Sequence, residues 1–181
     1  MADLARTRRE PLIATTPDLR PLPPAARHIL RGGPRVRLIA ENTLKVPVPA
    51  SACRAGVQDE RAALWLGPDE WLLICGEQAG NGTAAALGAA LAELPHSLVD
   101  VSHRQVALEL AGPRAETLLA AGCPLDLHIS AFPVGMCTRS VLGKAEVVLW
   151  RTAAQVFRIE VWRSFASYLT GFLEEAGRGI D

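Results

Sequence analysis

The chain has 181 residues, 49% of them apolar, and its 19 Lys and Arg residues balance its 19 Asp and Glu residues. This length suits one ordinary domain or two small subdomains, and the apolar fraction is large enough for a substantial core. A neutral chain has neither the basic patch of a nucleic-acid-binding protein nor the basic face that anionic membranes attract. Neither nucleic acid nor a membrane is therefore an expected partner.

The cysteines and the N-terminal residues indicate a cytoplasmic protein. The four cysteines include no CxxC pair, and a chain of this length does not need disulfides for stability, so we expect free thiols in a reducing compartment. Residues 1–10 are rich in Arg but contain no apolar stretch of the kind that a secretory signal requires. No apolar run in the sequence approaches the ~18 residues of a membrane helix.

The N-terminal part of the chain shows few regular patterns. Residues 1–34 are rich in proline and predict a partly disordered tail, with one short helix over 25–31. We expect the folded domain to cover 35–181 and to open with a strand over 36–40. The prolines of the segment 41–60 predict irregular structure there.

A hairpin is predicted next. Two apolar runs, over 62–66 and 71–75, flank the sequence GPDE at 67–70, in which Pro occupies a central turn position. Both runs are apolar at every position. Because strand side chains alternate between two faces, both faces of this part of the sheet should be covered.

The middle of the chain combines a helix with a bent β-rich stretch. The helix is predicted from Thr83 as N-cap to Pro95, and the stretch over 97–112 follows it. Apolar residues occupy odd positions up to Val101 and even positions from Val106 onward. Since a strand has a side-chain period of two, the chain must bend or turn between these two residues.

The second half predicts three strands between two helices. Gly143-Lys144 suits a two-residue type II′ hairpin turn, and the last helix should bury Phe165 and Leu169. The predicted elements are a helix after Gly112-Pro113, strands over 136–142, 145–150 and 155–162, and a helix capped by Ser164 and stopped by Gly177. Together these elements indicate an α+β fold with mixed or antiparallel sheets and helices on one face. The chain is either one domain or two subdomains, 35–96 and 97–181.

A catalytic site is not predicted, although Asp100, Ser102 and His103 lie within four residues. In an extended segment Ser102 and His103 point to opposite faces, and no GxSxG motif is present, so we favour a structural role at a backbone corner over a hydrolase. The histidines show no metal-ligand spacing, and no glycine-rich nucleotide-binding motif occurs. We expect no catalytic residue, cofactor or metal in this chain.

One strand suggests a surface for a partner protein. The strand over 155–162 alternates apolar residues on one face with Arg158, Glu160 and Trp162 on the other. A Trp on a charged face exposes apolar area unless a partner covers it, and Trp and Arg are favoured anchors of protein interfaces. We therefore predict Arg158 and Trp162 as contacts with a partner subunit. The alternative is that Trp162 packs over the start of the last helix.

Several segments resemble the gamma-subunit family of heterotetrameric sarcosine oxidase. Residues 66–72 read LGPDEWL, which looks like a signature of that family. Four further segments look similar and follow in the same order along the chain: DVSHR at 100–104, GPRA at 112–115, CPLDL at 123–127 and RSFA at 163–166. The resemblance covers about residues 62–176.

The C-terminal half also resembles a shortened folate-binding aminomethyltransferase, the T-protein of glycine cleavage. The segments 100–104 and 112–115 follow the order of that family. Where the family has an acidic pair, this chain has Ala145 and Glu146, and it is too short for the large folate pocket. The resemblance thus implies an aminomethyltransferase-like fold of two interlocked small subdomains that has lost the site.

The resemblance further implies an accessory subunit whose partners are the alpha, beta and delta subunits of sarcosine oxidase. That complex oxidatively demethylates sarcosine to glycine, with oxygen giving hydrogen peroxide, and tetrahydrofolate captures the one-carbon unit. FAD, FMN, NAD, zinc and tetrahydrofolate are expected on the other subunits and none of them in this chain. The alternative is a stand-alone folate-binding or one-carbon transferase-like protein.

Overall fold

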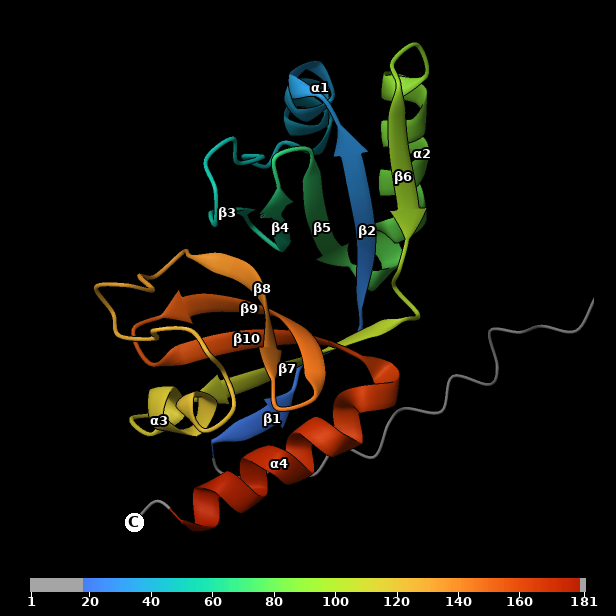
Figure 1. Cartoon of the computed structure of the whole chain (residues 1–181). Helices are drawn as coiled ribbons and strands as arrows, with labels where there is room; N and C mark the ends of the chain where they lie inside the picture. The colour runs from blue at the N-terminus through green and yellow to red at the C-terminus, as the bar shows by residue number, and fades with distance from the viewer. Residues whose placement is uncertain (1–17, 180–181) are drawn as a thin grey trace, which may run out of the picture.

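Two antiparallel sheets face each other in the computed structural model, which describes residues 18–179 (Figure 1). Helices α1 (Pro34–Leu44) and α2 (Gly80–Leu91) cover the outer face of the first sheet. Helices α3 (Ala115–Ala120) and α4 (Ala166–Arg178) cover the outer face of the second. The layers therefore run helices, sheet, sheet, helices. This arrangement confirms the predicted α+β fold with antiparallel sheets and helices on one face of each sheet.

Each sheet contains five strands. The first is built from β2 (Ala25–Gly32), β3 (Ala55–Gln58), β4 (Arg61–Gly67), β5 (Glu70–Gly76) and β6 (His96–Asp100) in the order β3-β4-β5-β2-β6. The second is built from β1 (Leu19–Pro21), β7 (Gln105–Ala111), β8 (Cys137–Leu142), β9 (Ala145–Ala153) and β10 (Val156–Trp162) in the order β1-β7-β10-β9-β8.

The two sheets share one topology. In the first, β2, α1, β4, β5, α2 and β6 form a split βαββαβ unit, and β3 adds an edge strand. The second repeats this strand order, with the N-terminal β1 in the place of the last strand and β8 added at the far edge. β1 pairs with β7 in the second sheet, whereas β2, the next strand along the chain, belongs to the first sheet. The two subdomains therefore interlock. The first sheet extends to Asp100, so the division predicted between residues 96 and 97 falls inside β6.

The predicted N-terminal tail with a helix over 25–31 is wrong for the residues that the structure describes. Residues 19–21 form β1, and the supposed helix is β2, which pairs with β5 on one side and with β6 on the other. Hydrogen bonds to two neighbouring strands outweigh the weak helix preference of the sequence AARHILR. The tail residues 1–17 lie outside the described part of the chain.

The strand predicted over 36–40 is also wrong, because this segment lies in α1. Pro34 occupies the first turn of the helix, where a missing backbone N–H leaves no hydrogen bond unmade. Val36, Ala40 and Leu44 follow one another at four-residue spacing and are buried. That spacing becomes visible only over a window longer than 36–40. Since the helix runs to residue 44, the predicted irregular segment also begins too early.

The hairpin of β4 and β5 is confirmed, and both of its faces are covered. Ala63 and Leu73 pack in the cluster beneath α1 and α2. Leu64 and Leu72 pack in the cluster between the two sheets. The apolar character of both arms is therefore explained by burial on both sides.

Most element boundaries in the second half agree with the sequence prediction, but helix ends differ. Gly143 has a φ of +60° in the turn between β8 and β9, as a type II′ turn requires at its first central position. A short 3₁₀ turn over Arg163–Phe165 precedes α4, so Ser164 is not its cap. Gly177 lies inside α4 rather than beyond it. In the first half, α2 starts at Gly80 instead of after a Thr83 cap.

A buried ion pair joins the two sheets. The Nε of Arg27 on β2 donates to the Oε2 of Glu160 on β10 at 2.6 Å, and the two side chains are only 2% and 1% exposed. Arg158 on β10 places its Nη2 2.7 Å from the Oε1 of the same carboxylate. Glu160 is therefore buried and Arg158 largely covered, because this face of β10 packs against the first sheet.

A second carboxylate is shared in the same way. Glu70, at the start of β5, accepts hydrogen bonds from Arg31 on β2 at 2.7 Å and from Arg139 on β8. The hydrogen bond from Arg139 lowers the pKa of Glu70, and burial opposes this effect only in part. Each of the two carboxylates is thus held by one arginine of each sheet.

Replacing Glu160 by Ala should lower the free energy of unfolding by about 3–5 kcal/mol, because Arg27 is left as an unpaired buried charge. Chemical denaturation of both proteins measures this difference. The control is Arg27→Met/Glu160→Leu, which removes both fully buried charges, leaves only the partly exposed Arg158 without its partner, and should recover most of the loss. A double variant no more stable than Glu160→Ala would show that packing, and not the unpaired charge, sets the cost.

Replacing Glu70 by Gln should give a stability loss that depends on pH. A carboxylate with a lowered pKa contributes stability that is fully present above its unfolded pKa, near 4.5, and that disappears as the pH falls through the folded pKa. The melting temperatures of wild type and Glu70→Gln should therefore differ at neutral pH and converge in acid. A gap that stays constant at all pH values below 4.5 would contradict this linkage.

Candidate partner interface

The corner between β6 and β7 connects the two subdomains. The Oγ of Ser102 accepts a hydrogen bond from the N–H of Arg27 at 2.9 Å, and the carboxylate of Asp100 accepts one from the N–H of Ser102 at 2.8 Å. The chain turns between Asp100 and Gln105, where the change of apolar parity predicts a bend. Ser102 therefore holds the corner, as predicted, whereas the side chain of His103 is exposed.

The charges at the corner favour an ionised Asp100. Partial burial acts to raise the pKa of Asp100, but the hydrogen bonds from Ser102 and the electrostatic effect of two nearby histidine side chains outweigh burial and lower it. Beneath the corner, burial lowers the pKa of His28 against the opposing effect of Asp100. The charged Asp100 is thus a strong acceptor for the backbone of the turn.

Replacing Ser102 by Ala should lower the free energy of unfolding by about 1 kcal/mol, the typical value for one lost hydrogen bond. His103→Ala should have almost no effect, because an exposed side chain leaves nothing unsatisfied when it is removed. Urea denaturation of both variants makes the comparison. Equal losses for the two variants would mean that the hydrogen bonds of Ser102 do not fix the corner.

Trp162 lies at the end of β10, next to this corner. Its surface is 38% exposed, and the guanidinium carbon of Arg104 lies 4.8 Å from its ring centroid. The N–H of Arg163 donates to the carbonyl oxygen of Arg104 at 2.8 Å, which fixes the corner against the end of the strand. Trp162 is therefore contacted by Arg104 and remains more than one third exposed to solvent.

Arg158, the other predicted contact residue, is not brought to the surface beside Trp162. Its side chain is 18% exposed and is paired with Glu160 between the sheets. An arginine held by a buried carboxylate is not available as an anchor for a partner. Arg104, which sequence reasoning missed, is the cation next to Trp162.

Three exposed aromatic residues follow one another here, and we call them the aromatic stripe: Trp162, Phe165 and Tyr168. Their exposed fractions are 38%, 38% and 37%, and no other aromatic residue in the range 18–179 is exposed. Trp162 ends β10, Phe165 ends the short 3₁₀ turn and Tyr168 lies in the first turn of α4, so the stripe follows the chain from the end of β10 into the start of α4. The prediction that Phe165 is buried is wrong, since it precedes α4 and its neighbour Ala166 is buried instead.

The stripe is tied to the second subdomain at its far end. The hydroxyl oxygen of Tyr168 accepts a hydrogen bond from the N–H of Lys144 at 3.1 Å. The Tyr168 ring also stacks with Phe172, with 6.3 Å between the ring centroids, and Phe172 packs against the core beneath α4. The three aromatic side chains are therefore presented by a fixed backbone.

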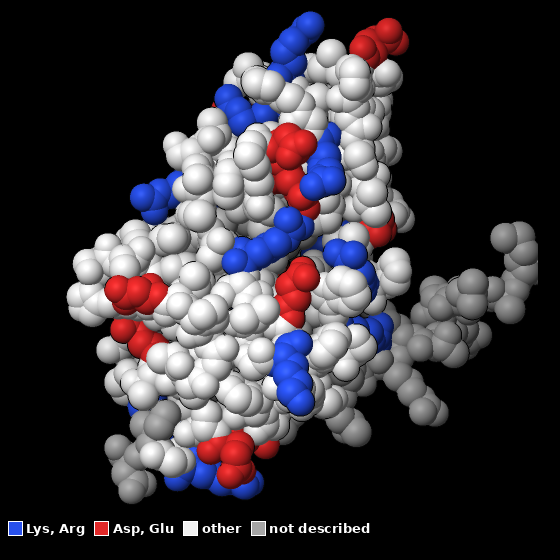
Figure 2. Space-filling view, in the orientation of Figure 1, with Lys and Arg blue, Asp and Glu red and all other residues white. Residues whose placement is uncertain are grey.

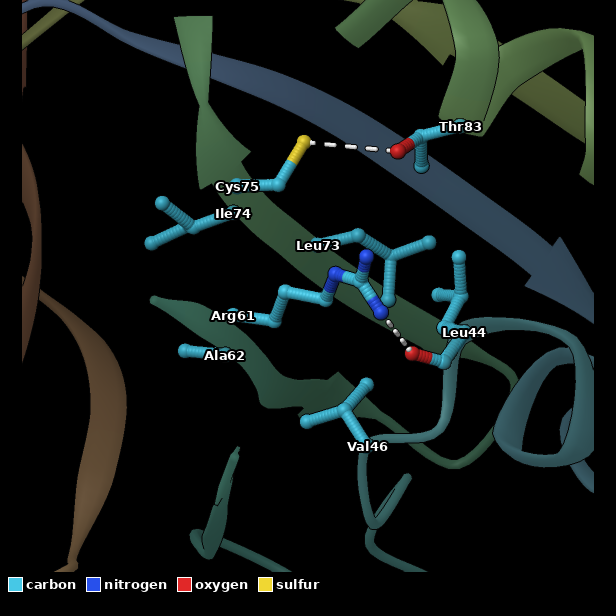
Figure 3. Close-up of a pocket in the computed structure, with 8 residues that line it drawn as sticks. All are labelled: Leu44, Val46, Arg61, Ala62, Leu73, Ile74, Cys75 and Thr83. Atoms are coloured by element: carbon cyan, nitrogen blue, oxygen red, sulfur yellow. Dashed lines mark hydrogen bonds between the residues drawn. The ribbon is translucent and has the colours of Figure 1, made fainter. Parts of the chain in front are cut away.

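A pocket in the first subdomain is small. Figure 3 shows Arg61 reaching across it to donate to the carbonyl oxygen of Leu44 at 2.8 Å. At its other end the sulfur of Cys75 lies 3.6 Å from the hydroxyl oxygen of Thr83. The cavity holds about 10 Å³, which is roughly the space of one water molecule. It is too small for a flavin, a nicotinamide or a folate.

The chemistry of other polar groups is equally limited. All four cysteines are free, and burial raises the pKa of Cys137 to about 12, so this thiol is not a nucleophile near neutral pH. Residues 18–179 contain no group of three or more His, Cys, Asp and Glu side chains that could hold a metal ion. On the face in Figure 2, basic and acidic side chains are interspersed.

No helix in the described part of the chain is both long and apolar enough to cross a membrane.

The sequence matches one protein family along most of its length. The family model described as "Sarcosine oxidase, gamma subunit family" matches residues 38–178. The chain belongs to this family. Sarcosine oxidase subunit gamma of Corynebacterium sp. (strain P-1) is 41% identical over 122 residues, which are 67% of this chain and 59% of that relative. The matched segment thus spans less than two thirds of the relative's length.

A solved structure supports the same family. The chain is similar to a chain of "Heterotetrameric Sarcosine Oxidase from Corynebacterium sp. U-96 in complex with pyrrole 2-carboxylate", with a TM-score of 0.83 and 31% identity. The match covers 89% of this chain and 83% of that chain. The resemblance to the gamma subunits in the sequence is therefore confirmed.

The fold is also that of an aminomethyltransferase. Glycine cleavage system aminomethyltransferase T from Bartonella henselae has a TM-score of 0.65 at 15% identity, over 88% of this chain and 46% of that protein. This likeness confirms the predicted fold. Ala145 and Glu146, which the sequence resemblance sets against the acidic pair, lie at the start of β9, where Ala145 is buried in the core and Glu146 is exposed.

The sequence contained a signal for the aromatic stripe. Aromatic residues at 162, 165 and 168 repeat every three residues, and Arg104 lies in the segment DVSHR that marks the corner. Sequence reasoning placed Trp162 near a surface but assigned Phe165 to the core. The juxtaposition of Arg104 and Trp162 depends on the antiparallel pairing of β7 with β10, in which Gln105 lies opposite Trp162.

Proposed function

We propose that this chain is the gamma subunit of a heterotetrameric sarcosine oxidase and serves there as a non-catalytic accessory subunit. The observation that carries the proposal is the family match over residues 38–178, together with the TM-score of 0.83 to a chain of such an enzyme. The family to which the chain belongs is that of gamma subunits, and the solved relative is a chain of a heterotetrameric enzyme. The partners in this proposal are the alpha, beta and delta subunits.

The proposed complex works in the cytoplasm and oxidatively demethylates sarcosine to glycine. Oxygen accepts the electrons and yields hydrogen peroxide, and tetrahydrofolate takes up the released one-carbon unit. In this proposal FAD, FMN, NAD, zinc and tetrahydrofolate are bound by the other subunits. The gamma subunit then contributes to assembly rather than to chemistry.

Three observations support an accessory role. The hydroxyl oxygen of Ser102 is engaged with the backbone of Arg27, which gives it a structural use at the corner. The pocket at Arg61 has room for about one water molecule. No carboxylate from the positions of the acidic pair points into the core, because Ala145 is buried and Glu146 is exposed.

The isolated chain should be colourless, free of stoichiometric zinc and inactive toward sarcosine. When co-expressed with the other three subunits, it should elute with them in size-exclusion chromatography, and omitting it should lower the yield of assembled enzyme. Visible absorption, metal analysis and chromatography measure these properties. A yellow isolated chain, or wild-type chain that never elutes with the flavoprotein subunits, would overturn the proposed function.

The alternative of a stand-alone folate-binding protein gives a different result. Titration calorimetry of the isolated chain with tetrahydrofolate should show no stoichiometric binding if the accessory role is correct. Tight one-to-one binding would favour the alternative.

A further inference from the structure

The aromatic stripe is an unusual surface for a small protein. Large apolar patches that stay exposed generally mark interaction sites, and aromatic side chains with arginine are the most frequent energetic anchors of protein interfaces. The described residues expose three aromatic side chains, and all three belong to the segment from Trp162 to Tyr168. The other exposed large apolar residues are aliphatic: Leu38, Val57, Val99, Ile129, Val134 and Val141.

The charge beside the stripe defines what could cover it. The guanidinium of Arg104 lies over the Trp162 ring, and no carboxylate within residues 18–179 forms an ion pair with it. The nearest acidic residue along the chain, Asp100, already accepts the N–H of Ser102. The corner thus offers one cation for a carboxylate from outside.

The backbone around the stripe is already ordered. Ser102 fixes the corner to β2, Arg163 fixes the end of β10 to the corner, and Tyr168 is bonded to the turn at Lys144. A surface that is ordered before binding loses little conformational entropy when it is covered. This geometry suits a stable subunit contact better than a transient one.

We infer that the aromatic stripe and Arg104 form the surface by which this chain docks onto a partner subunit of the oxidase. The partner supplies an apolar area that covers the three rings and a carboxylate that pairs with the Arg104 guanidinium. This inference rests on the proposed function, because the occupant is a subunit of that complex. It replaces the predicted contact pair of Arg158 and Trp162 by Arg104 and Trp162.

The test compares stripe variants with a matched control in the co-expressed complex. Trp162→Ala and Phe165→Ser should each weaken binding to the partner subunits by roughly tenfold or more. Val57→Ala, which truncates a 50% exposed residue on β3, is the control and should bind like wild type. Biolayer interferometry with immobilised partner subunits gives the dissociation constants.

The carboxylate is tested separately with Arg104→Gln. If a partner carboxylate pairs with Arg104, this variant should associate more slowly than wild type at low salt, and the two rates should converge as salt is raised. Equal association rates of the two proteins at all salt concentrations would show that no partner carboxylate pairs with Arg104.

The outcomes separate the docking surface from the function. Wild-type affinity in both Trp162→Ala and Phe165→Ser, or an equal loss in Val57→Ala, would overturn the docking surface while the assembled wild-type complex leaves the proposed function intact. Failure of the wild-type chain to bind any partner subunit would overturn both. If Trp162→Ala lowers the melting temperature by several degrees, the affinity of Phe165→Ser for the partner subunits decides whether the docking surface is correct. Phe165 suits this purpose because its side chain is exposed and it precedes α4. A wild-type chain that dimerises through the stripe, with the dimer lost in Phe165→Ser, would also overturn the inference.

Discussion

The structure depends most on the contact between Arg27 and Glu160. Arg27 is the residue at which both subdomains and their connection meet. Its side chain leaves β2 and reaches the carboxylate on β10, its N–H donates to Ser102, and its carbonyl oxygen accepts the N–H of Val101. One residue in the first sheet therefore fixes the second sheet and the corner between them. Because Glu160 lies on β10, this contact also helps to fix the end of β10, where the aromatic stripe begins.

A buried ion pair is not an obvious way to stabilise an apolar interface between sheets. Removing two charges from water costs as much as their attraction returns, and apolar replacements are often equally stable. The ion pair instead fixes the position of one sheet relative to the other. An apolar face can slide over another with little change in buried area, whereas the carboxylates of Glu160 and Glu70 must each meet one arginine from each sheet. We interpret both clusters as determinants of how the two sheets cross.

Two split βαββαβ units interlock through the N-terminal strand, and the same fold occurs in an aminomethyltransferase more than twice as long as the matched region. In this chain the start of β9 carries a core alanine and an exposed glutamate. The exposed aromatic rings of residues 18–179 lie elsewhere, at the end of β10 and the start of α4, with the guanidinium of Arg104 over the first of them. Aromatic residues and arginine are the residue types that are enriched in protein interfaces.

The sequence by itself determined those features that depend on neighbouring residues. The hairpin of β4 and β5 follows from its turn and its two apolar arms, and the corner at Ser102 follows from a change of parity. The family follows from a series of short motifs. The sequence predicted a helix where β2 lies and a strand where α1 begins, because residues 25–40 have weak local preferences. β2 acquires its structure from β5 and β6, whose paired residues lie 39 or more positions later in the chain. The tertiary structure alone decided that Arg158 is largely covered, with 18% of its side chain exposed, whereas Arg104 is exposed. Alternation along β10 separates its two faces, but only the packing of the second sheet against the first determines that the polar face is an interior one.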